Sequence, residues 1–282
     1  MPTWDFETHP PVRLELDVPV GRIEIDTVND ERTHVELEAL TSAGEELIEN
    51  ARVECRESGG VYQVRVLVPQ RNGWFISFER DPQLSVRISC PTKTDLHVRT
   101  KSADMTARGE YGSVDGKSAS GDLTIGEITG DVQIKTASAD VSLDEVGGQT
   151  QVNTASGDVA IQRAHGDVTA ALVSGDLWIR DAGASVRANT VSGDQRIEAV
   201  MDGVVESHSV SGDVWIGVRR GSQVYVDANT VSGSTNSELE LSDAPAGDRS
   251  SEEGPSLDVR AKTVSGDISI ARAPAPAQLP SS

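Results

Sequence analysis

A column of aspartates is the first set of residues in this chain that could do chemistry. Calcium takes roughly six to eight oxygen ligands, and carboxylates on one edge could supply some of them. Calcium-binding nonapeptide repeats carry Gly-Gly-x-Gly-x-Asp turns, whereas here glycine and aspartate are adjacent and the double glycine is missing. We therefore expect the aspartates to hydrogen-bond the local backbone of tight turns, with calcium binding as the alternative. The aligned residues are Asp104, Asp122, Asp140, Asp158, Asp176, Asp194 and Asp213.

The second candidate site is a change of residue type in an outward-facing column. Four positions after the serine that begins each repeat, the residues are small or polar until successive repeats carry Trp178, Arg196 and Trp215. Arg180 and Glu198 lie two residues further along, on the same face of a strand. An arginine between two indoles would form a cation–π stack, and both residue types are enriched in binding hot spots. The column predicts either a protein-binding surface or a ladder that only stiffens a sheet.

The element that positions both columns is a repeat of 18 residues. Counted from each repeat's serine, aliphatic residues recur at positions 3, 5 and 8, and again at positions 12, 14 and 17. Alternation over a few residues indicates a strand, and the nine-residue offset between the halves indicates two strands per coil. The repeat predicts an all-β fold, a parallel β-solenoid with two strands in each 18-residue coil. The serines are Ser102, Ser120, Ser138, Ser156, Ser174 and Ser192, with further copies at Ser211, Ser232 and Ser265.

The extent of the 18-residue period divides the chain into four regions. Residues 1–83 are rich in strand patterns but off the period, and predict an irregular N-terminal cap layer with one short helix between Gly44 and Asn50. Residues 84–270 predict the solenoid. An acidic segment, 237–256, predicts a loop inserted into the stack, and the proline-rich residues 271–282 predict a disordered tail.

The composition limits location and partners. With 45 acidic against 25 basic residues, the formal charge of −20 disfavours nucleic acid and anionic lipid as partners. The first residues have neither a basic run nor an apolar stretch, and no later run is long enough to span a bilayer, so we expect a cytoplasmic protein without membrane insertion. Two cysteines, Cys55 and Cys90, are too few for a disulfide framework, and we expect reduced, partly buried thiols.

The recurring string Thr-Val-Ser-Gly-Asp resembles a known bacterial family. It occurs around Thr190–Asp194 and Thr263–Asp267, and a close variant occurs at Val210–Val214. The chain is similar, over roughly Val12 to Ile270, to the β-strand-repeat family labelled "putative adhesin" (domain of unknown function 4097). The resemblance implies a stacked parallel β fold and brings no catalytic residues with it.

No residue pattern in the chain predicts catalysis. The five histidines share no metal-ligand spacing, and no nucleophile motif or phosphate-binding glycine loop appears. We expect a non-enzymatic scaffold or protein-interaction module without a cofactor, which binds a protein partner or associates with itself. The alternatives are a self-assembling structural protein, a calcium- or glycan-binding adhesin, and a polysaccharide-acting β-helix enzyme that uses paired carboxylates.

Overall fold

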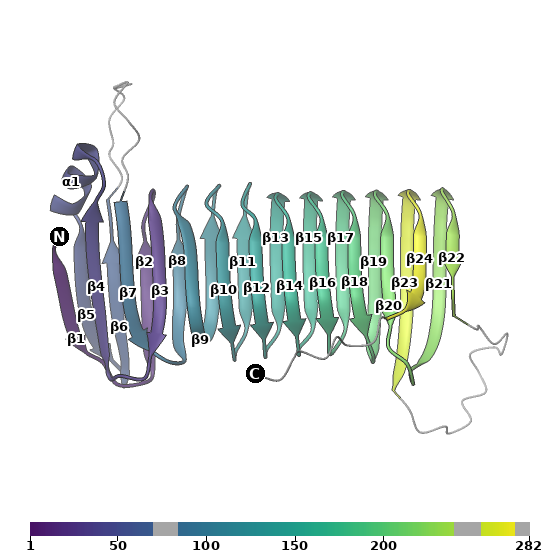
Figure 1. The fold of residues 1–282 in the computed structure, drawn as a ribbon, viewed down its shortest axis with the longest axis horizontal. Coiled ribbons are helices and arrows are strands. Elements are labelled where there is room, and N and C mark those ends of the chain that lie inside the picture. Colours follow the sequence, from purple (N-terminus) through teal and green to yellow (C-terminus); the bar gives the residue numbers. More distant parts are fainter. Residues whose placement is uncertain (70–83, 240–254, 274–282) are drawn as a thin grey trace, which may run out of the picture. The chain divides into compact units, whose positions relative to one another are not determined.

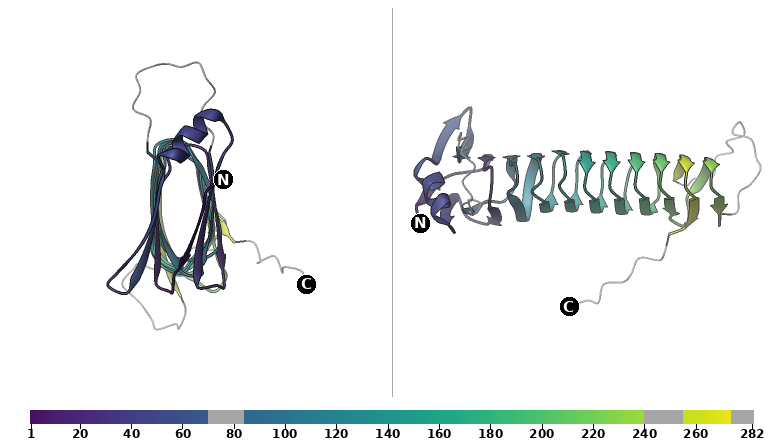
Figure 2. Two further views of the ribbon diagram at one scale, coloured as in Figure 1. Left: turned by 90° about the vertical axis from the view of Figure 1, so that its left-hand side faces the viewer. Right: turned by 90° about the horizontal axis from the view of Figure 1, so that it is seen from above.

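The fold is seen in a computed structural model, which describes residues 1–69, 84–239 and 255–273. The chain forms two compact units, residues 1–158 and 159–282. In each unit the strands lie side by side, and a coil is a flattened loop with one strand on each side of the core (Figures 1 and 2). The expected all-β solenoid with parallel strands is confirmed.

The described residues of the first unit form thirteen strands and one helix. In chain order they are β1 (Thr3–Glu7), β2 (Val12–Asp17), β3 (Arg22–Val28), β4 (Arg32–Ala39), α1 (Ser42–Glu49), β5 (Arg52–Ser58), β6 (Val61–Leu67), β7 (Leu84–Pro91), β8 (Thr94–Arg99), β9 (Asp104–Ser118), β10 (Leu123–Ile128), β11 (Val132–Thr136), β12 (Val141–Val146) and β13 (Thr150–Ser156).

In the second unit, the part that the structure describes forms eleven strands. They are β14 (Val159–Ala164), β15 (Val168–Ser174), β16 (Leu177–Ala182), β17 (Val186–Ser192), β18 (Gln195–Val200), β19 (Gly203–Ser211), β20 (Val214–Val218), β21 (Gln223–Ser232), β22 (Thr235–Ser237), β23 (Ser256–Ser265) and β24 (Ile268–Arg272).

Columns of aliphatic side chains form the core between the two strands of each coil. In the second unit one column carries isoleucine in five neighbouring strands, and these isoleucines lie opposite one another. All five are at most 1% exposed. Burial of one such side chain stabilises the fold by roughly 1.5–3 kcal/mol, so a narrow seam of aliphatic residues suffices. The column is Ile161, Ile179, Ile197, Ile216 and Ile270.

The strand order differs from the order along the chain in both units. In the first unit β2 lies between β6 and β8, and β3 lies between β7 and β9. In the second unit β23 lies between β19 and β21, and β24 lies between β20 and β22. The first coil, β2 and β3, and the last coil, β23 and β24, are therefore each inserted between two coils that are not both their neighbours in sequence. Each of these two coils has strand partners on both sides, which leaves neither with an open edge.

The residues before the regular repeat form strands of both directions. Antiparallel pairs join β1 to β4, β4 to β7 and β5 to β6, whereas β2 and β3 pair only in parallel. The expected helix is present as α1, whose N-cap hydroxyl, Thr41 Oγ1, accepts a hydrogen bond from the Gly44 N–H at 3.2 Å. Most of the predicted insertion 237–256 and of the predicted tail 271–282 lies outside the described residues.

Candidate functional site

Trp178, Arg196 and Trp215 lie next to one another in three neighbouring strands. The register of β16, β18 and β20 places Trp178 opposite Arg196, and Arg196 opposite Trp215. The guanidinium carbon of Arg196 lies 4.5 Å from the centroid of the Trp215 ring, which is a cation–π contact. Arg196 is exposed and both tryptophans are half-buried. The structure therefore brings the three residues of the column together on one outward face.

Glu198 links the two tryptophans through Arg196. The Arg196 Nε donates a hydrogen bond of 3.0 Å to Glu198 Oε1, and the Trp178 side chain donates to the same carboxylate. Partial burial of the carboxylate opposes its ionisation. The hydrogen bonds from Arg196 and Trp178 and the charges of Arg196 and Arg180 outweigh this effect, and they lower the pKa of Glu198. The predicted residues thus form one connected network.

Gly217 makes room for the Trp215 ring. A Cβ atom on Gly217 would lie 2.9 Å from Cη2 of that ring and 2.1 Å from the carbonyl oxygen of Glu198. In the two preceding coils this position carries Arg180 and Glu198. The absence of a side chain at Gly217 therefore leaves space for the indole beside its own strand.

A buried polar cluster lies beneath Arg196 in the core. Gln195 is 1% exposed and takes the inward position that Leu177 and Val214 occupy in the neighbouring strands. Its Nε2 donates 2.9 Å hydrogen bonds to Thr190 Oγ1 and to the His208 carbonyl oxygen, and its Oε1 accepts a 2.6 Å bond from Ser207 Oγ. The sequence analysis missed Gln195, although a polar residue in an aliphatic column is a readable signal.

Small side chains flank the tryptophan column. Ala160 lies opposite Trp178 in β14, and Ser269 lies opposite Trp215 in β24. The indoles and the guanidinium are therefore the largest groups on this part of the face. The arrangement offers aromatic surface, a cation and an ionised carboxylate on a rigid sheet, which are groups suited to contact another protein.

The aspartate column is a hydrogen-bond ladder along the corners of the coils. In each unit, Oδ1 of an aspartate accepts the backbone N–H of the equivalent residue in the adjacent coil, at 2.7–3.1 Å. The sequence analysis expected these carboxylates to bond the local backbone of their own turns, whereas these bonds join one coil to the next. Among residues 1–69, 84–239 and 255–273, no three His, Cys, Asp or Glu side chains are grouped so as to hold a metal ion. The accepting carboxylates are Asp104, Asp122, Asp140, Asp176, Asp194, Asp213 and Asp267, while Asp158 contributes its N–H to Asp140.

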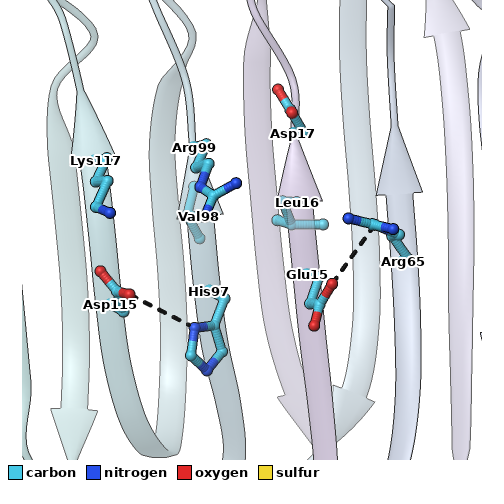
Figure 3. Close-up of a pocket in the computed structure, with 9 residues that line it drawn as sticks. All are labelled: Glu15, Leu16, Asp17, Arg65, His97, Val98, Arg99, Asp115 and Lys117. Carbon is cyan, nitrogen blue, oxygen red and sulfur yellow. Dashed lines mark ion pairs between the residues drawn. The ribbon is translucent and has the colours of Figure 1, made fainter.

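A shallow hollow of about 140 Å³ lies on the outward face of the first unit, over β6, β2, β8 and β9 (Figure 3). Two ion pairs cross it: Arg65 Nε lies 3.5 Å from Glu15 Oε2, and His97 Nδ1 lies 3.7 Å from Asp115 Oδ2. Arg65 and Glu15 therefore neutralise each other's charge in this row, and the His97 ring lies beside the Asp115 carboxylate.

The next row on that face carries three cations in adjacent strands. The register places Arg99 opposite Lys117, and Lys117 opposite Lys135. All three are exposed, and none forms an ion pair with another residue that the structure describes. Like charges in directly opposed positions destabilise a sheet. The three residues are spaced by the repeat length, so the period that aligns the tryptophans also reveals them, but the sequence analysis did not single them out.

A family model described as Toastrack DUF4097 matches residues 13–271, which is nearly the whole of the chain. The chain belongs to the Toastrack DUF4097 family. The resemblance found in the repeated Ser-Gly-Asp strings is thereby confirmed. No curated protein matches this Toastrack chain.

Three solved bacterial structures are similar to this Toastrack protein. A "putative cell adhesion protein" from Clostridium sporogenes is 11% identical, with a TM-score of 0.27, and the match covers 96% of this chain and 99% of that one. A "putative adhesin" from Bacteroides fragilis is 15% identical, with a TM-score of 0.39 and coverage of 95% of both chains. A "putative lipid binding protein" from Parabacteroides distasonis is 11% identical, with a TM-score of 0.44 and coverage of 97% and 96%.

The thiols and the helix of this Toastrack chain add no further site. Both cysteines are free, and burial raises the pKa of Cys90 to about 12, so that thiol stays protonated. In the part of the chain that the structure describes, no helix is long and apolar enough to cross a bilayer.

Proposed function

We propose that this Toastrack protein is a non-enzymatic cytoplasmic scaffold that binds a protein partner through the face formed by Trp178, Arg196 and Trp215. The observation that carries the proposal is the joining of these three side chains and Glu198 into one network on an outward sheet face. Aromatic residues make up only 4% of the chain, and two of its four tryptophans belong to this column. Tryptophan and arginine dominate binding hot spots because they bury large surfaces and donate hydrogen bonds.

The network favours binding because it fixes the side chains before a partner arrives. Ordering a flexible side chain at an interface costs roughly 0.5–1.5 kcal/mol, and a preorganised side chain avoids that cost. Glu198 accepts hydrogen bonds from both Arg196 and Trp178, and Arg196 in turn stacks on the Trp215 ring, for which Gly217 leaves room.

The test replaces Trp178 and Trp215 together with threonine, which already occupies the same repeat position at Thr106 and Thr124. Tagged wild-type protein and the double variant are each used to capture proteins from the native host, and the bound proteins are identified. Trp4→Thr in β1 is the matched control, since it makes the same side-chain change in a strand of the first unit.

We expect a specific partner to be captured by the wild type and by the Trp4→Thr variant, and to be absent from the double variant. Circular dichroism must show that the double variant keeps its sheet content. If the folded double variant captures the same proteins in the same amounts, the column is a structural ladder and the proposal is wrong.

A further inference from the structure

Among the residues that the structure describes, β21 is an edge strand of the second unit. It is ten residues long and pairs with β23 alone among the residues that the structure describes. The core column that is fully buried in β23, at Leu257 and Val259, continues in β21 as Val224 and Val226, which are only half-buried. The hydrophobic core of this unit therefore reaches β21, and no further coil from the described residues covers it there.

The composition of β21 does not protect it from pairing with another strand. Its sequence is Gln-Val-Tyr-Val-Asp-Ala-Asn-Thr-Val-Ser, in which Asp227 is the only charged residue. Its outward side includes Tyr225, which is 40% exposed, and Val231, which is 80% exposed. In contrast, the edge strand β5 of the first unit has four charged residues among its seven. Charges on an edge strand discourage pairing with another chain, and β21 has almost none.

Within the described part of the chain, no strand pairs with the backbone groups on the side of β21 that faces away from β23. The N–H of Gln223 donates to the carbonyl oxygen of Pro255, on the side of β23. Because successive residues of a strand direct their N–H and C=O groups to opposite sides, the groups of Val224, Val226 and Ala228 are directed away from β23. These groups can pair with a further strand.

We infer that β21 pairs in antiparallel fashion with β21 of a second copy of this chain, across a two-fold axis at Ala228. A two-fold axis makes the contact self-complementary, and therefore closes a dimer instead of extending a filament. The inward side chains of the two copies must face the same core, which restricts the axis to positions that pair inward residues with inward residues. An axis at Asp227 would oppose two carboxylates and is excluded by their repulsion.

The axis at Ala228 satisfies both the backbone and the side chains. Ala228 then exchanges backbone hydrogen bonds with Ala228 of the partner subunit. Val226 exchanges backbone hydrogen bonds with Thr230 of the partner subunit. Tyr225 lies opposite Val231 of the partner subunit, which covers the two exposed apolar side chains of each edge. Tyr225 and Val231 fall in a pair without mutual backbone hydrogen bonds, where the Cα atoms approach to about 4.5 Å and the side chains make close contact.

The inference is tested by sedimentation velocity of the full chain over a range of concentrations. Val226→Pro removes an N–H on the open side of β21 and leaves the hydrogen bonds to β23 in place, because proline is tolerated where its missing N–H faces away from the sheet. Val226→Ala is the matched control, since it removes apolar volume and keeps the N–H. By symmetry the proline deletes two intersubunit hydrogen bonds, so we expect the dimer dissociation constant to rise about thirtyfold.

A pair of charge substitutions tests the register. Tyr225→Glu alone should weaken the dimer, and the double variant Tyr225→Glu/Val231→Lys should restore it, because each glutamate then lies opposite a lysine of the partner subunit. A monomer at all concentrations, an open polymer, or a dimer that responds equally to Val226→Pro and Val226→Ala would overturn the inference. A dimer with the correct proline response but no rescue by the double variant would overturn the register at Ala228. The Trp178/Trp215 variant leaves β21 intact and should dimerise normally, so this test is independent of the protein-binding face.

Discussion

Replacing Gly193 with alanine tests how closely the coils approach at the Ser-Gly-Asp corner. Gly193 has φ +136°, and a Cβ atom there would lie 2.1 Å from the carbonyl oxygen of Gly175 in the adjacent coil. A side chain at this φ costs roughly 1–3 kcal/mol through backbone strain alone. The oxygen must also retreat to an ordinary contact distance, which stretches corner hydrogen bonds such as the 2.7 Å bond from the Asp194 N–H to Asp176 Oδ1. Two weakened bonds add about 2 kcal/mol.

Gly221→Ala is the matched control for this substitution. Gly221 also has a positive φ, +95°, but a Cβ atom there would meet nothing within 4 Å. Both substitutions remove a similar amount of chain freedom from the unfolded state, so their difference isolates the contact between coils. We expect Gly193→Ala to lower the thermal midpoint, followed by circular dichroism, by roughly 4–8 °C more than Gly221→Ala does. Equal midpoints would refute the claim that the approach of adjacent coils requires glycine at this corner.

Three further predictions concern the charged columns. The pKa of Glu198 is lowered in the folded protein, so its ionised form stabilises the fold above its ordinary pKa of 4.5, and this stabilisation is lost as the pH falls through the lowered value. The wild type should therefore have a higher thermal midpoint than Glu198→Gln, and this difference should decrease below about pH 5. A difference in thermal midpoint that does not depend on pH would contradict the network. Lys117→Gln should raise stability by a few tenths of a kcal/mol at low salt, with no gain at high salt, as measured by thermal melts. Arg196→Ala should increase quenching of tryptophan fluorescence by acrylamide because it uncovers the Trp215 ring, whereas Arg187→Ala in β17 should not.

The regular coils were predictable because every repeat shows the 18-residue period and the alternation of aliphatic and polar residues. The spatial order of the coils was not predictable, because the repeats resemble one another. Inward residues of β19 and β21, such as Val205 and Val226, are alike, so either strand offers β23 a suitable partner, and both pair with it. Sequence similarity between repeats thus contains no information on which of them are neighbours. The N-terminal strands do not follow the 18-residue repeat, and several of them pair in antiparallel fashion.

The candidate site was predictable in its membership but not in its contacts. The 18-residue spacing aligns Trp178 with Arg196, and the 19-residue step to Trp215 is absorbed by an irregularity in the ladder. The bond from Trp178 to Glu198 and the position of the Trp215 ring depend on side-chain rotamers and on Gly217, which a column of letters does not show. For Gln195, the sequence shows a polar residue at an aliphatic position of the repeat, but only the structure shows its hydrogen-bond partners.

The most direct measurement of the proposed binding role is site-specific photocrosslinking in the native host. A photoreactive phenylalanine derivative replaces Ser269, which lies beside Trp215 in β24, and in a separate variant replaces Thr106, which holds the same repeat position in the first unit. We predict a covalent adduct with one partner protein from position 269 and none from position 106. An absence of adducts from position 269, or the same adducts from both positions, would contradict a protein-binding face at Trp178, Arg196 and Trp215.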